Sequence, residues 1–364
     1  MVETKYMKKI VNMFIATVVT FASLTTVQIA RAHEHTVSAD TKRVEMFQEK
    51  VSQRTTRRAP HEPVVVENQA YLEDAEFSLK INNIVVPYNV FSLFVLPEEI
   101  TELEIIYPQP DKTYQLFENG LMVEKSESMT WHWQAKDTPG EQRLEIRSED
   151  GQVNMSLNVF VMVPAEKVQG GRLKYYHIGP YPDESEVKNK DVYVEPEGFI
   201  EVTKNNQELL LSPHFKLKEF TSKQRSDYPK FVYLRPSLLL KLEMLRREMN
   251  INNIHVANMV IMSGYRTPQY NKAIGNVKFS RHVYGDAADI FVDNDGNYRM
   301  DDLNNDGTVN VEDADVMASM VAELNKRSEY KGLIGGLGVY GPKPHRGPFI
   351  HIDTRGIKAR WRKP

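Results

Sequence analysis

The sequence predicts an α+β protein in which an all-β region precedes a C-terminal domain of mixed helices and strands. From about Ala70 to Pro164, apolar and polar residues alternate, which is the period of half-buried strands. From Pro236 to Met249, leucine and methionine recur at helical spacing. Short apolar runs after that helix, Val260–Met262 and Ile290–Val292, are typical of buried strands.

The all-β region is expected to span residues 67–165 as an immunoglobulin-like sandwich. Alternating runs such as Phe77–Ile81 are separated by turn signals such as Glu118–Gly120. Several short strands in so short a region favour this kind of sandwich. Trp131 and Trp133 share one face of a strand, where they either bind a glycan or fill the core, and core tryptophans are more common. The region contains no catalytic pattern, so we expect a spacer or a binding module.

Composition narrows the class of protein. The chain has 364 residues, enough for two domains and connectors. Its formal net charge is −3, so we expect no broad basic surface and no nucleic-acid partner. It contains no cysteine, which excludes disulfides, thiolate metal sites and a cysteine nucleophile.

The N-terminus has the pattern of an export signal. Three lysines precede the apolar run Ile10–Leu24, and Ala30–Ala32 supplies small residues for cleavage. We therefore expect a signal peptide over residues 1–32, a polar linker over 33–66, and a periplasmic or secreted mature chain. The alternative is an uncleaved membrane anchor, which the short, interrupted run disfavours. No other segment is apolar enough to span a membrane, so we expect no stable span after cleavage.

Residues 166–210 are rich in glycine, proline and tyrosine and predict a connector that packs against the following domain. The C-terminal domain is expected over residues 211–364. Within it, the turn Ser263–Pro268 follows a predicted strand and places Arg266 at the strand's end. A guanidinium there can hold a carboxylate with two hydrogen bonds or stabilise an oxyanion.

Two further motifs of this domain offer a metal site. The run Ser280–Asp289 contains His282 and Asp289, and Phe349–Asp353 contains His351. Two imidazoles and a carboxylate, with the fourth position open, are a usual ligand set for a catalytic zinc ion. The small residues between His282 and Asp289 let the backbone turn closely around an ion. The ligands are expected on or beside adjacent strands, which hold a metal more rigidly than loops do.

These three motifs, in this order, resemble the zinc D-Ala-D-Ala carboxypeptidase family, which includes VanY-type carboxypeptidases, murein endopeptidases and phage endolysins. The resemblance covers roughly residues 211–364. It implies the hedgehog/DD-peptidase fold, a compact α+β domain with an antiparallel sheet. It also implies zinc on His282, Asp289 and His351, substrate contact by Arg266, and a supporting role for Ser280.

The chain departs from this family at the general base. Members commonly carry Glu or Asp three residues before the last zinc histidine, where this chain has Pro348. Asp353 and His345 are the nearby substitutes. Asp353 lies on the same strand face as His351, so it either points at the metal or orients another group. His345 lies in a Gly/Pro loop that can reach over the site. The sequence does not choose between them.

An insertion over residues 293–313 predicts a second ion. Its spacing is that of an oxygen-ligand calcium loop with Gly307 at the sharp turn, ending in Asp as dockerin-type loops do. The alternative is a solvated acidic loop. The expected calcium ligands are Asp302, Asn304, Asp306, Thr308, Asn310 and Asp313.

We therefore expect an exported zinc metallopeptidase that hydrolyses peptidoglycan stem peptides, as a carboxypeptidase or a D,D-endopeptidase. Zinc would activate water, and a carboxylate or histidine would take and return its proton. The alternative is a peptidoglycan-binding protein that keeps the fold and the zinc but hydrolyses weakly, which Pro348 favours. A zinc peptidase acting on other peptides is a third possibility.

Overall fold

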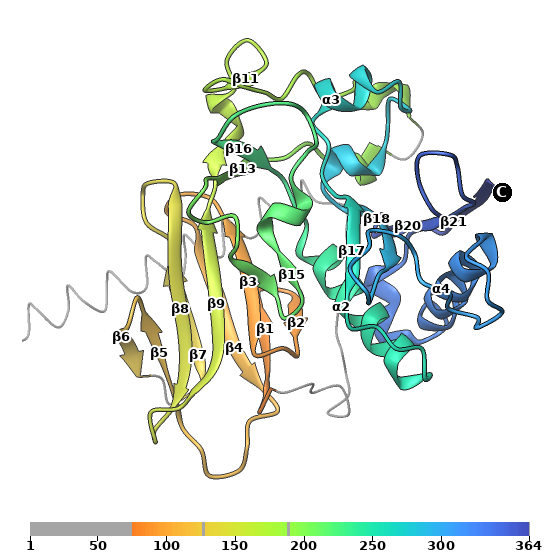
Figure 1. Cartoon of the computed structure of the whole chain (residues 1–364). Coiled ribbons are helices and arrows are strands. Elements are labelled where there is room, and N and C mark those ends of the chain that lie inside the picture. The colour runs from red at the N-terminus through yellow and green to blue at the C-terminus, as the bar shows by residue number, and fades with distance from the viewer. Residues whose placement is uncertain (1–74, 126–127, 188–189, 364) are drawn as a thin grey trace, which may run out of the picture. The chain divides into compact units, whose positions relative to one another are not determined.

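The computed structural model describes residues 75–125, 128–187 and 190–363, which belong to one compact unit (Figure 1). The predicted signal peptide and linker lie outside the described residues. Within these ranges, no helix is long and apolar enough to cross a membrane.

Two sheets make up the first part of the described chain and lie one behind the other in Figure 1. The four-stranded sheet has the order β2 (Ile84–Val86), β1 (Ser78–Ile81), β4 (Ile100–Ile106), β7 (Thr130–Gln134). The five-stranded sheet has the order β3 (Val90–Val95), β9 (Val153–Val161), β8 (Gly140–Ser148), β5 (Tyr114–Glu118), β6 (Leu121–Lys125). All pairs are antiparallel except β3 with β9.

The inward faces of both sheets contribute to one hydrophobic core, as the alternating sequence predicts. Leu79 and Leu103 come from one sheet, and Leu116 and Leu157 from the other. Trp131 and Trp133 are buried, at 1% and 3% exposure, so they fill the core instead of presenting a glycan-binding surface. The immunoglobulin-like character of this region stays a prediction.

The connector is structured and paired. Strand β13 (Gly198–Val202) pairs with β10 (Val163–Pro164) and with β16 (Lys230–Val232). Leu210 carbonyl oxygen accepts hydrogen bonds from Ser92 Oγ at 3.2 Å and from Asn158 Nδ2 at 2.8 Å. The smaller elements are β11 (Arg172–Leu173), β12 (Tyr176–His177), β14 (Leu210–Ser212), β15 (Phe215–Lys216), and the 3₁₀ helices η2 (Ala165–Lys167), η3 (Glu184–Glu186), η4 (Lys190–Val192) and η5 (Leu217–Phe220).

The C-terminal part is built on one five-stranded sheet. Its order is β17 (Met259–Ser263), β18 (Ala287–Val292), β20 (Phe349–Asp353), β19 (Gly336–Tyr340), β21 (Ala359–Lys363). The expected antiparallel sheet needs one correction, because β19 and β21 run parallel. After β20 the chain returns past β19 and adds β21 on its far side, so β21 takes the direction of β19.

Helices cover one face of this sheet. The expected helix at Pro236 is confirmed as α2 (Pro236–Ile251), with the proline in its first turn. Helix α4 (Val311–Leu324) packs on α2, β19 and β20. Ile290, Ile350 and Val339 are neighbours in the pairing and point to this buried face. The remaining helices are α3 (Pro268–Ala273), η6 (Arg281–Tyr284) and η7 (Ser328–Leu333).

Candidate metal centre

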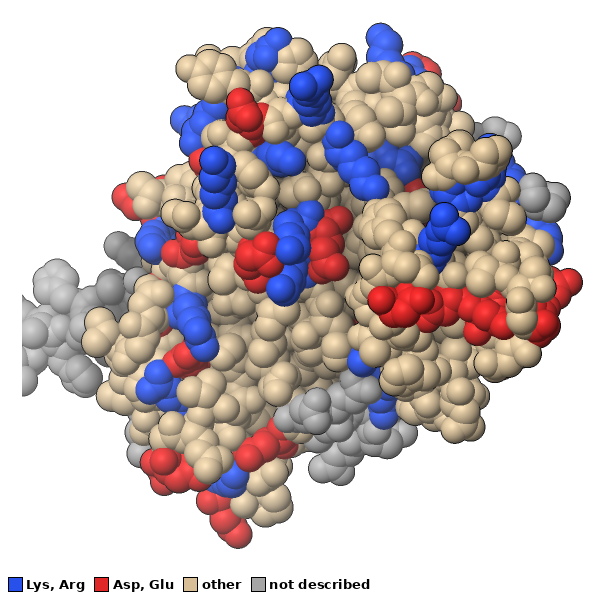
Figure 2. Space-filling model, in the orientation of Figure 1, with Lys and Arg blue, Asp and Glu red and all other residues tan. Residues whose placement is uncertain are grey.

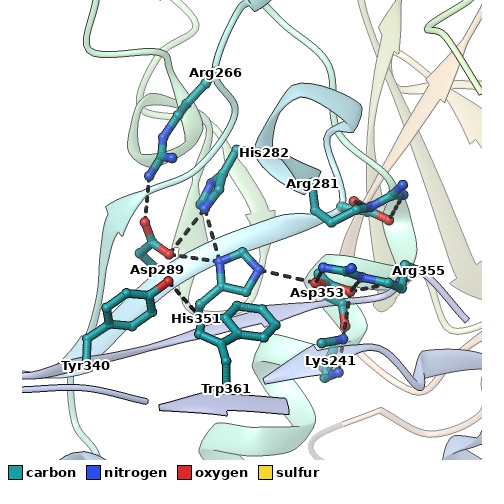
Figure 3. A network of polar contacts seen from close by, with 12 residues as sticks. Lys241, Arg266, Arg281, His282, Asp289, Tyr340, His351, Asp353, Arg355 and Trp361 are labelled. Atoms are coloured by element: carbon teal, nitrogen blue, oxygen red, sulfur yellow. Dashed lines mark hydrogen bonds and ion pairs between the residues drawn. The ribbon is translucent and has the colours of Figure 1, made fainter. Parts of the chain in front are cut away.

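The structure brings His282, Asp289 and His351 together (Figure 3). Asp289 Oδ1 lies 2.9 Å from His351 Nδ1 and 3.2 Å from His282 Nε2, and the two nitrogens are 3.2 Å apart. Asp289 on β18 is directly paired with His351 on β20, so both side chains rise from the same face of the sheet. This is the face opposite the helices, because side chains alternate along each strand.

His282 reaches the centre from η6, which lies beside β18. Gly285 ends this short helix at φ 69°, and a Cβ there would lie 2.5 Å from the Tyr233 carbonyl oxygen. His282 Nδ1 lies 2.7 Å from the Gly264 carbonyl oxygen, so it is the nitrogen that donates. Nε2 is left with a lone pair that faces Asp289 and His351.

His351 uses its nitrogens in the opposite way. Its Nε2 lies 3.2 Å from Asp353 Oδ2, which fixes that nitrogen as a donor. Its Nδ1 then faces Asp289 and His282. The Gly264 carbonyl oxygen and the Asp353 carboxylate thus set the tautomers of the two histidines, so that one unprotonated ring nitrogen of each points inward.

This donor set fits a zinc ion. Four ligands at about 2.0–2.1 Å in a tetrahedron lie roughly 3.3 Å from one another. The separations of 2.9–3.2 Å among the three inward atoms are close to that value. Three lone-pair atoms this close repel one another unless a cation or a shared proton lies between them.

The charges at the centre are strongly coupled. Burial lowers the pKa of His282, and the Arg266 guanidinium acts in the same direction. Burial opposes protonation of His351, but its hydrogen bonds to Asp289 and Asp353 outweigh it and raise its pKa. Burial alone would raise the pKa of Asp289, yet the two histidines hold it well below its usual range. Asp289 is therefore ionised, the form that binds a metal.

Asp353 lies on the far side of the His351 ring from Asp289, away from the inward-facing atoms (Figure 3). It is fully buried, and its oxygens accept from the Gly336 amide at 2.8 Å and from Arg355 Nε at 2.9 Å, besides Arg355 Nη2 and His351. This placement suits the second of its two predicted roles, which is to orient His351. His345 lies exposed at the tip of the 341–348 loop and makes no hydrogen bond to the three clustered residues.

Arg266 is engaged with the cluster itself. Its Nη2 donates to Asp289 Oδ2 at 2.6 Å, and its Nε donates to Ser263 Oγ at 2.9 Å. It therefore fixes Asp289 in place, and two of its donor groups are not free for substrate. Ser280 is buried and begins the 3₁₀ helix that carries His282.

The sequence reasoning missed an aromatic wall beside His351. The Trp361 ring lies 5.1 Å from the His351 ring, and Trp361 Nε1 donates to Tyr340 Oη at 2.8 Å. Tyr340 stacks on Phe349 with 4.5 Å between ring centroids. Gly338 makes room for this wall, because a Cβ there would lie 2.2 Å from Trp361 Nε1. Period-two alternation from His351 identifies Phe349, but Trp361 joins the site only through strand pairing.

A buried ion pair supports the His282 turn. Arg281 donates through Nε and Nη2 to the two oxygens of Asp286, and both side chains are almost fully buried. Arg281 Nη1 also donates to the Val192 carbonyl oxygen in the connector. Its guanidinium lies over the Tyr193 and Tyr284 rings. The connector is thus attached directly to the motif that carries His282.

The predicted calcium loop is closed by its own hydrogen bonds. Asp302 accepts from the amides of Asp306 and Gly307. Asp313 accepts from the Leu303 and Asn310 amides and caps helix α4 together with Asn310. The acidic side chains that converge within 4.8 Å in this insertion are Asp293, Asp295 and Asp301, which are not the predicted ligands. Calcium binding by residues 302–313 stays a prediction.

The surface in view carries both charge signs. Figure 2 shows lysine and arginine interspersed with aspartate and glutamate, and one row of acidic side chains at the right. This pattern agrees with the nearly balanced formal charge of −3.

Comparison with known proteins supports a metallopeptidase. Residues 213–310 match the Peptidase M15 family model. The matched segment contains Arg266, His282 and Asp289 and ends before His351. A family of peptidases implies a peptide substrate, and the converging His and Asp side chains agree with metal dependence.

The other comparisons add little. No curated protein matches the chain. A solved structure of fibronectin(III)-like modules of CbhA from Clostridium thermocellum matches with 13% identity and a TM-score of 0.17. It covers 23% of this chain and 94% of that one, and the score is too low to assign a fold.

Proposed function

We propose that the protein is an exported zinc metallopeptidase that hydrolyses peptidoglycan stem peptides. The observation that carries the proposal is the convergence of His282 Nε2, His351 Nδ1 and Asp289 Oδ1 within 3.2 Å. The Peptidase M15 match supports the proposal, because the matched residues 213–310 include His282 and Asp289. Export rests on the N-terminal sequence pattern alone.

His282, Asp289 and His351 would hold the ion, with one ligand position left for substrate or water. When bound, zinc would supply a Lewis acid that polarises a peptide carbonyl and lowers the pKa of water. Arg266 holds Asp289, and the acceptors Gly264 and Asp353 hold the two rings. Trp361 and Tyr340 form one wall beside His351.

The test is digestion of purified peptidoglycan, followed by mass analysis of the fragments. The arms are the mature protein with zinc, with a chelator, and as His351→Ala, with the exposed His255→Ala as a matched control. Zinc-dependent loss of one alanine per stem identifies a carboxypeptidase, and loss of crosslinked dimers identifies an endopeptidase. Both activities should vanish in His351→Ala and persist in His255→Ala. Unchanged peptidoglycan with zinc still bound contradicts the proposal.

A second candidate is a peptidoglycan-binding protein with weak or no hydrolysis. The position of Asp353 on the far side of the His351 ring favours this candidate. Asp353 therefore does not place a carboxylate beside the inward-facing atoms to replace the general base that Pro348 lacks. His345→Ala separates the candidates further. Loss of hydrolysis with retained zinc would assign the proton transfer to His345, whereas pull-down of peptidoglycan by a protein that cleaves nothing would favour the binding role.

A further inference from the structure

The carboxylates around the metal centre each have a guanidinium partner. The three pairs are Asp289 with Arg266, Asp286 with Arg281, and Asp353 with Arg355. Two of them have the same geometry, because Arg281 and Arg355 both donate through Nε and Nη2 to the two oxygens of the carboxylate. None of these three arginines has its full fork available for a substrate.

Arg346 is different, because no carboxylate pairs with it in the part of the chain that the structure describes. Its Nη1 donates to the Gly341 carbonyl oxygen at 2.8 Å and to the Gly347 carbonyl oxygen at 3.2 Å. Across the described ranges, neither Nε nor Nη2 has a hydrogen-bond partner. The edge that stays open is the same Nε/Nη2 edge with which Arg281 and Arg355 hold their carboxylates.

The guanidinium of Arg346 is held in place beside the metal centre. It lies 4.5 Å from the centroid of the Phe349 ring, which is stacked on Tyr340. Phe349 is two residues before His351 on β20 and therefore shares its face of the sheet. Burial lowers the pKa of Arg346 and the charge of Asp289 opposes this, so the guanidinium is within electrostatic reach of the cluster. Carbonyls and rings have already restricted its side chain, so binding would lose little conformational entropy.

We propose that Arg346 binds a free carboxylate of the peptide substrate through Nε and Nη2. The inference deepens the proposed function and rests on it for the identity of the peptide. It moves the carboxylate-binding role from Arg266, which is engaged with Asp289 and Ser263, to the loop between β19 and β20. A carboxylate there would complete a fourth arginine–carboxylate pair on this face of the sheet.

The experiment compares two probes, the stem pentapeptide with free carboxylates and the same peptide with all carboxylates converted to carboxamides. Equilibrium binding is measured by calorimetry on chelator-treated protein, where metal-dependent hydrolysis is prevented. Hydrolysis of both probes is measured separately on zinc-loaded protein. The proteins are the wild type, Arg346→Gln, Arg346→Lys and, as a matched control, Arg362→Gln. Arg362 is next to Trp361 on β21, points to the opposite face and pairs with Asp315.

We expect the wild type to bind the free acid at least about tenfold more tightly than the carboxamide. Arg346→Gln should bring this ratio to about one, and Arg346→Lys should give an intermediate ratio because lysine keeps the charge without the fork. Arg362→Gln should behave as the wild type does. A wild type that does not distinguish the probes, or an Arg346→Gln variant that keeps the wild-type ratio, overturns the inference.

The two proposals fail separately in this design. If the preference for the free carboxylate depends on Arg346 but neither probe is hydrolysed, the role of Arg346 is supported and the proposed peptidase activity on this substrate is contradicted. If the probes are hydrolysed but the preference does not depend on Arg346, the peptidase activity is supported and the role of Arg346 is contradicted.

Discussion

At the scale of single residues, the candidate site depends on which nitrogen of each histidine carries hydrogen. His282 donates through Nδ1 to a backbone carbonyl, and His351 donates through Nε2 to Asp353. The two rings therefore present different nitrogens to one point. Asp353 is itself fixed by Arg355 and the Gly336 amide, so its carboxylate has one position available.

Replacing Asp353 by asparagine should weaken zinc binding by about 10–100-fold, because the amide accepts less strongly and leaves the His351 ring less well oriented. Competition with a chelating dye measures the dissociation constant, and circular dichroism checks that the variant is folded. Asp315→Asn, which changes a partly exposed aspartate on helix α4, is the matched control. Equal zinc affinity in Asp353→Asn and the wild type would show that Asp353 does not support the metal centre.

The residues of the cluster could be predicted from the sequence because they lie in short motifs with fixed spacing. His282 lies in η6 and Asp289 on β18, which follows it directly, and His351 lies in an alternating strand. The same alternation leaves the role of Asp353 open, because sharing a face with His351 does not determine on which side of the ring the carboxylate lies. Arg346 and Trp361 could not be predicted, since their position depends on the conformation of a loop and on the pairing of β19 with β21.

At the scale of elements, a buried lysine joins helix α2 to the sheet. Lys241 Nζ donates to the Asp353 carbonyl oxygen at 2.7 Å and to the Leu333 carbonyl oxygen at 3.0 Å. It thereby ties α2 to the end of β20 and to η7. Burial lowers the pKa of Lys241 to about 8, against the opposing effect of Asp353 and Asp286.

This pKa predicts a pH dependence of stability. Below pH 8, Lys241 carries its proton in both the folded and the unfolded states. Between about pH 8 and pH 10.5 only the unfolded state keeps it, so the free energy of unfolding rises with pH. From pH 7.5 to pH 10, the wild type should gain about 2 kcal/mol relative to Lys241→Met, because all other titrating groups are common to both proteins.

Urea unfolding at several pH values measures this difference. Lys358→Met, which removes an exposed lysine, should follow the wild-type profile. A constant difference between the wild type and Lys241→Met across this range would mean that the folded protein keeps Lys241 charged.

The elements themselves were predicted with uneven success. Helix α2 and strands β17, β18 and β20 follow from apolar periodicity. Strand β21 has three charged residues and only two apolar ones, Ala359 and Trp361, so its alternation is too short to give a clear signal. Its position is set by its pairing with β19, and the residue pattern of a single strand does not show which strand it pairs with.

At the scale of the whole described molecule, the sandwich and the C-terminal sheet share a core. One cluster of buried residues runs from Phe91 of the sandwich through Phe199 of the connector to Leu211 and Leu238. Polar contacts reinforce it, since Ser92 and Asn158 both donate to the Leu210 carbonyl oxygen. We therefore expect these parts to unfold together, so that an ion at the metal centre stabilises the sandwich as well.

Zinc at about 1,000 times its dissociation constant adds about 4 kcal/mol to the stability of whatever unfolds with the site. For a unit of this size, the midpoint temperature of unfolding should rise by on the order of 10 °C.

The three tryptophans make the test specific, because Trp131 and Trp133 are in the sandwich and Trp361 is beside His351. In Trp361→Phe, fluorescence reports the sandwich alone while the three clustered side chains remain. Zinc should raise the midpoint seen by fluorescence as much as that seen by calorimetry, and it should change neither in His351→Ala. If calorimetry resolves two transitions and zinc moves only the one that fluorescence does not see, the sandwich unfolds independently and the shared core does not couple it to the metal centre.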